Sequence, residues 1–214
     1  MDNCAPFAPM FRLIAVYRAA IPTRELAPQL KGLGEVAGCQ VSVRRDEQLP
    51  GGQVPDLHTV LEVRCRDLDT LDAVDGKLAA ATSPVARLRT REHILVDHGV
   101  SADAVKGVFL FRRREDLALA EFQRYWLDHH GPIASRTPDC QRYVQCHVLP
   151  DSYDHGSPAY DGVTEIYWPD YDATVRSMSS ESMTVEQAGD APNFVAPGSV
   201  DLLLTREEQV DPGT

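Results

Sequence analysis

The predicted secondary-structure elements follow one order, strand-helix-strand-strand-helix-strand, and this order occurs twice in the 214 residues. Apolar runs and alternating apolar and polar residues predict the strands, and apolar residues at spacings of three and four predict the helices. In the first copy the strands cover 11–18, 39–46, 58–65 and 92–99, and the helices cover 24–33 and the residues after Asp67. In the second copy the strands cover 106–114, 140–150, 163–169 and 199–207, and the helices cover 115–130 and the residues after Asp170.

This order is that of the ferredoxin-like fold, whose antiparallel sheet carries both helices on one face. The other face of such a sheet must be buried against a second layer, so two copies predict two sheets that meet on their helix-free faces. We therefore predict an α+β chain of two ferredoxin-like βαββαβ halves that form a fused barrel. Residues 1–100 would be a degenerate half and residues 101–214 the second half.

Composition narrows the range of partners. The net charge of −11 argues against nucleic acid and anionic membranes. The five cysteines form no C-x-x-C pair, which predicts reduced thiols in a cytoplasmic protein. Arg12 and Arg18 interrupt the first apolar run, so it predicts neither a signal peptide nor a membrane span. We expect a small-molecule partner, and a monomeric fused barrel or a homodimer.

Polar residues alternate with apolar ones in two strands of the second half. In one strand Tyr143, Gln145 and His147 share a face, and in the next Glu165 and Tyr167 share a face. A helix-covered face is expected to be apolar, so the Tyr143 set is predicted to point away from the helices. If Glu165 and Tyr167 face the same way, all five residues line one interior surface. The alternative is that the sheets do not close and these residues form a solvated face.

The helix predicted at 115–130 ends in two adjacent histidines. Phe122, Trp126 and His130 follow one another at a spacing of four and continue a buried stripe, whereas His129 borders that stripe. Gly131 and Pro132 are typical of residues just past a helix end. The histidines are therefore either catalytic groups or a capping pair without chemistry.

The second half resembles the EthD family of the dimeric α/β-barrel superfamily over about residues 106–207. The matching motifs are a Phe-x-x-Tyr-Trp helix, a His before a small residue and Pro, a Tyr-x-Gln-x-His strand and an Asp-Gly-x-x-Glu strand. They stand here at Phe122, Tyr125, Trp126, His130, Pro132, Tyr143, Gln145, His147, Asp161, Gly162 and Glu165. The resemblance implies an enzyme fold that supports cyclisation, dehydration, isomerisation or oxygenation of small aromatic or polyketide-like molecules. EthD-like members often need no cofactor.

From these features we expect a cofactor-independent acid/base enzyme of the lyase (dehydratase), isomerase or cyclase type, acting on a small aromatic or polyketide-like carbonyl compound. His130 would transfer the proton, because an imidazole titrates close to neutrality. Tyr143 and His147 would orient the substrate oxygen, and Glu165 would be a second acid or base. The expected substrate-binding residues are Phe122, Trp126, His129, Gln145 and Tyr167.

Two alternatives stay open at this point. A haem- or metal-dependent oxygenase could take ligands from the histidines at 129, 130, 147 and 155 and from Glu165, although no tight ligand spacing such as H-x-x-x-H is present. A non-catalytic small-molecule-binding module would use the same polar groups only for orientation. The polar segment 177–194 is either a flap over the pocket or a surface connection.

Overall fold

The computed structural model describes residues 10–21, 28–30, 32–154 and 156–210. Residues 24–27 and 31 of the first predicted helix (24–33), together with His155, lie outside these residues. Eight antiparallel strands form a closed barrel in the order β1-β3-β2-β8-β5-β7-β6-β4. The strands are β1 Phe11–Tyr17, β2 Val36–Arg44, β3 Thr59–Cys65, β4 Ala86–Asp97, β5 Val105–Phe111, β6 Arg142–Val148, β7 Gly162–Trp168 and β8 Asp201–Val210.

The strand order within each half is the same. Along the barrel the first four strands read β4-β1-β3-β2 and the last four read β8-β5-β7-β6, and the pairs β2–β8 and β4–β6 join the two sets. The registers correspond as well, since Arg12 lies opposite Thr90 and Lys106 lies opposite Thr205. The prediction of a closed antiparallel barrel in a mixed α/β fold is thus confirmed.

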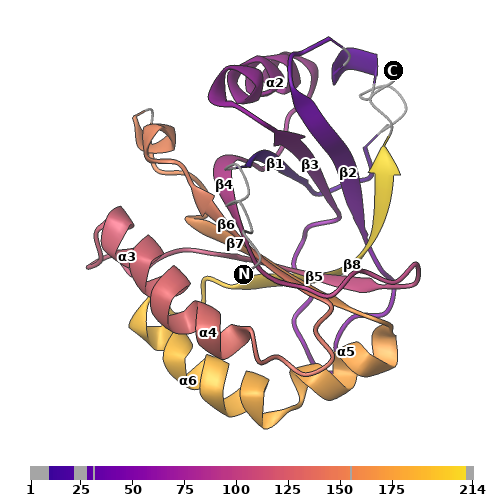
Figure 1. Ribbon diagram of the computed structural model, residues 1–214, viewed down its shortest axis with the longest axis vertical. Helices are drawn as coiled ribbons and strands as arrows, with labels where there is room; N and C mark the ends of the chain where they lie inside the picture. Colours follow the sequence, from indigo (N-terminus) through magenta and orange to yellow (C-terminus); the bar gives the residue numbers. More distant parts are fainter. Residues whose placement is uncertain (1–9, 22–27, 31, 155, 211–214) are drawn as a thin grey trace, which may run out of the picture.

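Helices cover the outside of the barrel (Figure 1). Helix α2 Leu68–Ala81 packs on β1 and β3, and its N-cap Asp67 accepts a 2.7 Å hydrogen bond from the Thr70 amide. The other side carries α3 Leu119–Tyr125, the π-helix η1 Trp126–His130, α4 Gly131–Ala134, α5 Tyr171–Met178, the π-helix η3 Ser182–Gln187 and α6 Ala188–Asp190. Short 3-10 turns, η2 Pro150–Tyr153 and η4 Ala191–Asn193, complete the described elements. None of the helices in the described part of the chain is long and apolar enough to cross a membrane.

The barrel interior is itself a core. One part of it is apolar and is filled by inward side chains such as Ile14, Leu88, Val108 and Val144. The other part holds a cluster of ion-paired side chains that come from both halves of the chain. The space between barrel and outer helices forms separate cores, one of which groups the rings of Phe111, Phe122, Trp126 and Phe194.

Candidate active site

The helix that carries His130 does not end at the Gly-Pro pair. Residues Trp126–His130 form a π-turn in which the Gly131 amide donates to the Trp126 carbonyl, and the helix continues to Ala134. Proline lacks an amide hydrogen, and its ring collides with the carbonyl four residues earlier in a regular α-helix. The wider π-turn accommodates Pro132, so the prediction that Gly131 and Pro132 end the helix was wrong. Such π-turns occur frequently at functional sites.

The two adjacent histidines lie in different environments. His129 is exposed and stacks on Tyr125, with ring centroids 4.9 Å apart. His130 is buried, and its Nδ1 lies 2.8 Å from Oδ2 of Asp190, a residue that ends α6. The His130 ring also contacts Phe194 at a centroid distance of 4.7 Å. The substrate-binding role expected of His129 therefore has no support in its position, since it does not line the cavity that His130 borders.

Asp190 fixes the state of the His130 ring. The carboxylate also accepts hydrogen bonds from the Tyr125 hydroxyl (2.7 Å) and the Asn193 amide (3.0 Å). Burial raises the pKa of Asp190, but the hydrogen bonds from Tyr125, Asn193 and His130 outweigh it and lower that pKa. Burial lowers the pKa of His130 while Asp190 partly restores it. At neutral pH the ring is therefore neutral, donates Nδ1–H to Asp190 and carries its lone pair on Nε2.

His130 lines a cavity of about 270 Å³ between the barrel and the outer helices. We call it the His130 cavity. Its walls are mostly apolar and include Phe109, Phe111, Trp126, Ile166, Met183 and Phe194. Its polar members are His130, Tyr143, Thr164 and Gln187. A concave, apolar pocket with a few convergent polar groups is the usual form of a small-molecule site.

Both π-helices contribute to this cavity. The first supplies Trp126 and His130, and the second, η3, supplies Met183 and Gln187. The segment 177–194, for which flap and surface connection were both open, is helical for most of its length and forms one wall through η3, α6 and Phe194. It also brings Asp190 to His130.

The Tyr143 hydroxyl is held by a chain of side chains along β6. Nε2 of Gln145 donates to the Tyr143 oxygen (2.7 Å) and to the Trp126 carbonyl (3.1 Å), and Oε1 of Gln145 lies 2.9 Å from Nε2 of His147. Tyr143 thus accepts this hydrogen bond, and it also lines the His130 cavity. Burial raises the pKa of Tyr143 far above its ordinary value, so the residue remains a phenol and a donor.

His147 does not reach the His130 cavity. Its ring stacks on Trp126 at 4.4 Å with an interplanar angle of 8°, and it lines a different cavity of about 410 Å³. Burial, with His93 and Arg91, lowers the pKa of His147 to about 3, so the ring is neutral. His147 thus does not converge with His130 on one cavity, as the sequence led us to expect, and it contacts Gln145 instead. Phe122 lies behind Trp126 and Phe111, and it does not line the His130 cavity.

Glu165 and Tyr167 point into the barrel, on the opposite face of the sheet from Tyr143. The register pairs Val144 with Glu165 and Tyr143 with Ile166, so Glu165 shares the inner face with Val144. The prediction that Tyr143, Gln145 and His147 point away from the helices was therefore wrong, and the five residues do not line one surface. The apolar side chains of β6 point into the closed barrel. Its polar side chains point toward the helix layer, where Gln145 donates to the Trp126 carbonyl.

Glu165 belongs to an interior ionic cluster, which the remaining strands complete. The cluster comprises Arg12, Glu62, Arg64, Glu92, Lys106, Glu165 and Glu207. The Arg12 guanidinium lies 2.8 Å from Glu165 and 2.9 Å from Glu62, and it also contacts Glu92. Lys106 contacts Glu62 and lies 3.1 Å from Glu165. The cluster is a structural feature of the lumen rather than part of the His130 cavity.

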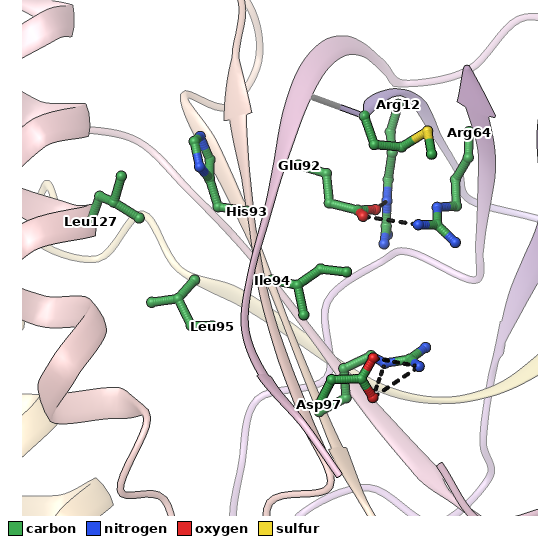
Figure 2. Close-up of a pocket in the computed structure, with 10 residues that line it drawn as sticks. Arg12, Arg64, Glu92, His93, Ile94, Leu95, Asp97 and Leu127 are labelled. Carbon is green, nitrogen blue, oxygen red and sulfur yellow. Dashed lines mark hydrogen bonds and ion pairs between the residues drawn. The ribbon is translucent and has the colours of Figure 1, made fainter. Parts of the chain in front are cut away.

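A further cavity of about 600 Å³, the Arg64 cavity, opens beside β4. Figure 2 shows Glu92 and Ile94 on one side of that strand, toward Arg12 and Arg64, and His93 and Leu95 on the other, toward Leu127. Its charged groups already satisfy one another: Arg64 binds Glu92 at 2.9 Å, and Asp97 accepts two hydrogen bonds from Arg142 at 3.1 Å. The described residues contain no group of three or more His, Cys, Asp or Glu that could hold a metal ion.

Residues 114–198 match the sequence model of the EthD domain. This part of the chain, less than half of its length, is therefore similar to the EthD domain. It contains His130, Tyr143, Gln145 and Asp190, and thus all the polar groups whose hydrogen bonds define the site. A comparison with curated proteins finds no match.

Solved structures of low sequence identity share the barrel of the whole chain. An anthrone oxidase-like protein has a TM-score of 0.61 at 11% identity, covering 95% of this chain and 94% of that chain. A mutant chlorite dismutase from Candidatus Nitrospira defluvii has a TM-score of 0.54 at 11% identity, covering 94% and 92%. At such identities the similarity establishes the fold and not the reaction.

Proposed function

We propose that the chain is an acid/base enzyme of the lyase, isomerase or cyclase type, and that the EthD domain carries its active site. The substrate would be a small, flat, largely apolar carbonyl compound that fits the aromatic walls of the His130 cavity. The observation that carries the proposal is the Asp190–His130 pair, whose free Nε2 has no partner among the described residues and lines an apolar cavity.

The chemistry follows from the two polar groups. Nε2 of His130 takes a proton from the carbon next to the substrate carbonyl, and the resulting imidazolium is stabilised by the Asp190 carboxylate. The Tyr143 hydroxyl donates a hydrogen bond to the carbonyl oxygen as that oxygen becomes an enolate. The imidazolium then returns the proton, either to a different carbon, which is isomerisation, or to a departing hydroxyl group, which is dehydration. The aromatic walls exclude water from the enolate.

Deuterium exchange tests the first step by itself, whatever the later steps of the reaction are. Bicyclic aromatic ketones such as 1-tetralone are incubated with the protein in D₂O, and incorporation next to the carbonyl is followed by NMR. We expect His130→Gln to lower the enzyme-dependent exchange by roughly 10²-fold or more. His129→Gln is the matched control and should retain wild-type exchange, because that ring is exposed. Equal exchange by His130→Gln and wild type, across a panel on which wild type is active, would refute the role of His130.

The same base supports an oxygenase as a second candidate. The fold shared with the anthrone oxidase-like protein and the apolar cavity favour it. A carbanion formed next to an aromatic ring can reduce O₂ and form a C–O bond to it. The peroxide anion that results takes up a proton from His130 and then loses water to leave a ketone. An oxygen electrode distinguishes the candidates, since a lyase or isomerase consumes no O₂.

Haem is not supported by the dimensions of the site. Pockets for drug-sized ligands hold roughly 300–1,000 Å³, and a haem is larger than most such ligands. The His130 cavity of about 270 Å³ is smaller than that range. We therefore derive no step through haem, and a Soret band in the purified protein would contradict this assignment.

We also propose that the barrel is a fusion of two copies of one half. The sequence Leu-x-Thr-Arg-Glu occurs at the same place in the last strand of each half, ending at Glu92 in β4 and at Glu207 in β8. Glu62 and Glu165 likewise hold the fourth position of β3 and of β7. Separate expression of residues 1–100 and 101–214 tests the proposal: the two pieces should associate into a folded complex, and failure of the mixed pieces to fold would argue against it.

A further inference from the structure

The cavity behind Trp126 differs from the Arg64 cavity in that its arginines, unlike Arg12, Arg64 and Arg142, are not paired with carboxylates of the described residues. It holds about 410 Å³, and β4, the α3–η1 helix and the end of β6 form its walls. We call it the Arg91 cavity. Arg91 and Arg124 stand at its mouth, His93 and His147 lie at its base, and Leu127 and Leu149 form apolar wall. It shares none of its lining residues with the His130 cavity.

Arg91 and Arg124 have no carboxylate partner among the described residues. Most neighbouring arginines are neutralised: Arg89, for example, lies 3.0 Å from Asp151, and Arg142 binds Asp97. The Arg91 guanidinium lies over the Phe11 ring at 5.6 Å. Asp128 is the one acidic residue of the lining, so two guanidinium groups face one carboxylate in a chain whose net charge is −11. Such an excess of cationic donors favours an oxyanion.

The base of the cavity adds two imidazoles. The rings of His93 and His147 lie 4.5 Å apart. Burial lowers the pKa of His93, with a further decrease from Arg91 and an opposing effect of Glu92. The pKa of His147 is lowered by burial, His93 and Arg91, and its Nε2 is engaged with Gln145. An anion beside these rings would favour their protonated forms, so their titration reports occupation of the cavity.

We propose that the Arg91 cavity is a second ligand site, which binds the carboxylate of a small molecule with an apolar body. Arg91 and Arg124 pair with the carboxylate, and Leu127, Val148, Leu149 and Pro150 contact the body of the ligand. Both guanidinium groups are exposed at the mouth, so an anion can reach them without unfolding. This site is independent of the reaction proposed for the His130 cavity.

Benzoate is the probe, and benzamide, which has the same shape without the charge, is its matched control. Binding is followed by ¹H–¹³C NMR of the histidine rings, with assignments from His93→Gln, His130→Gln and His147→Gln. We expect benzoate to shift the His93 and His147 resonances saturably and to raise their pKa values, and benzamide to do neither. Inorganic phosphate is run in parallel, and an equal response to it would overturn the proposal, because the apolar body would then contribute nothing to binding.

Charge removal identifies the binding residues. Arg91→Ala combined with Arg124→Ala should weaken benzoate roughly tenfold for each arginine lost. Arg206→Ala is the matched control, because Arg206 holds the position on β8 that Arg91 holds on β4, is also exposed and has no carboxylate partner in the described part of the chain. Wild-type affinity in the double variant, equal binding of benzamide, or shifts confined to His130 would each overturn the proposal.

Discussion

The interior ionic cluster makes a quantitative prediction about stability and pH. Three cations (Arg12, Arg64 and Lys106) face four carboxyl groups, and the side chains of Glu62, Glu165 and Lys106 are almost completely buried. Glu62 and Glu165 contact the same two cations, Arg12 and Lys106, and we expect this buried pair of carboxyl groups to share one proton. If the Glu62–Glu165 pair binds one proton, three of the four carboxyl groups are ionised, and their charge balances that of the three cations. The two carboxyls therefore titrate as a pair.

The direction follows from the environment of the pair. Burial, together with the neighbouring Glu165 carboxylate, raises the pKa of Glu62 to about 8. Burial also raises the pKa of Glu165, but Arg12 and Lys106 outweigh that effect and lower it. A group whose folded pKa exceeds its unfolded pKa stabilises the fold fully below the unfolded value, near 4.3. That contribution disappears as the pH rises through the folded pKa.

The magnitude comes from linkage between proton binding and folding. With a folded pKa of about 8 and an unfolded pKa of about 4.3, the pair contributes roughly 3 kcal/mol at pH 6 and less than about 1 kcal/mol at pH 8. Glu62→Gln replaces the shared proton by an amide hydrogen that does not titrate. The difference in unfolding free energy between wild type and Glu62→Gln should therefore change by about 2 kcal/mol over this interval, with wild type losing stability.

Urea denaturation of wild type and variant at pH 6 and pH 8 measures this difference. The lowered pKa values of His93, His130 and His147 make both proteins gain stability over the same interval, and this gain cancels in the comparison. Glu165→Gln should also abolish the pH dependence, because the remaining carboxyl ionises in acid beside Arg12 and Lys106. Exposed Glu208→Gln should retain it. A constant difference between wild type and Glu62→Gln would refute the shared proton.

Three other predictions concern the active site. Asp190→Asn should lower the pKa of His130, because the ring loses its carboxylate partner. It should also lower the rate of deuterium exchange by at least roughly tenfold, and a pH–rate profile measures both effects. Tyr143→Phe should reduce the rate of exchange more than the affinity for the ligand, because the Tyr143 hydrogen bond strengthens as charge develops on the substrate oxygen. Equal losses of rate and affinity in steady-state kinetics would contradict this. Gly162→Ala should destabilise by about 1–3 kcal/mol in urea, because a Cβ there would lie 2.7 Å from the Trp126 ring. Gly189→Ala, with open space around the new methyl group, should not.

The sequence was sufficient for features that depend on local pattern and element order. The repeated order predicted the closed barrel, and the period of the Phe122–Trp126 stripe separated buried His130 from exposed His129. The Asp67 cap was predictable because its hydrogen bond spans three residues. These features depend on the spacing of residues within one element or on the order of the elements, and both can be read from the sequence.

The site could not be completed from the sequence because its key contacts are distant in the chain. Asp190 lies 60 residues from His130, and no local signal distinguishes it from the other acidic residues near it. The orientation of β6 was predicted wrongly because alternation identifies two faces but not which of them is covered. In a closed barrel both faces are buried, and Tyr143, Gln145 and His147 find polar partners in the helix layer. The π-turn, which sets the direction of His130, was also not predictable. Its only sign in the sequence is Pro132, which lies within the continuing helix.

The space between helix and sheet is filled differently in the two halves, and the chemistry that we propose lies in the second half. In the first half, Leu71, Val74 and Leu78 of α2 pack with Leu13 and Leu61 of the sheet into a filled aliphatic core. In the second half the corresponding layer contains aromatic rings, π-turns and a hydrogen-bonded polar chain around a cavity. Two π-turns and buried polar groups cost stability, and the apolar burial in the filled first half offsets that cost. A substitution that enlarges the His130 cavity should therefore be tolerated best when the first half remains intact.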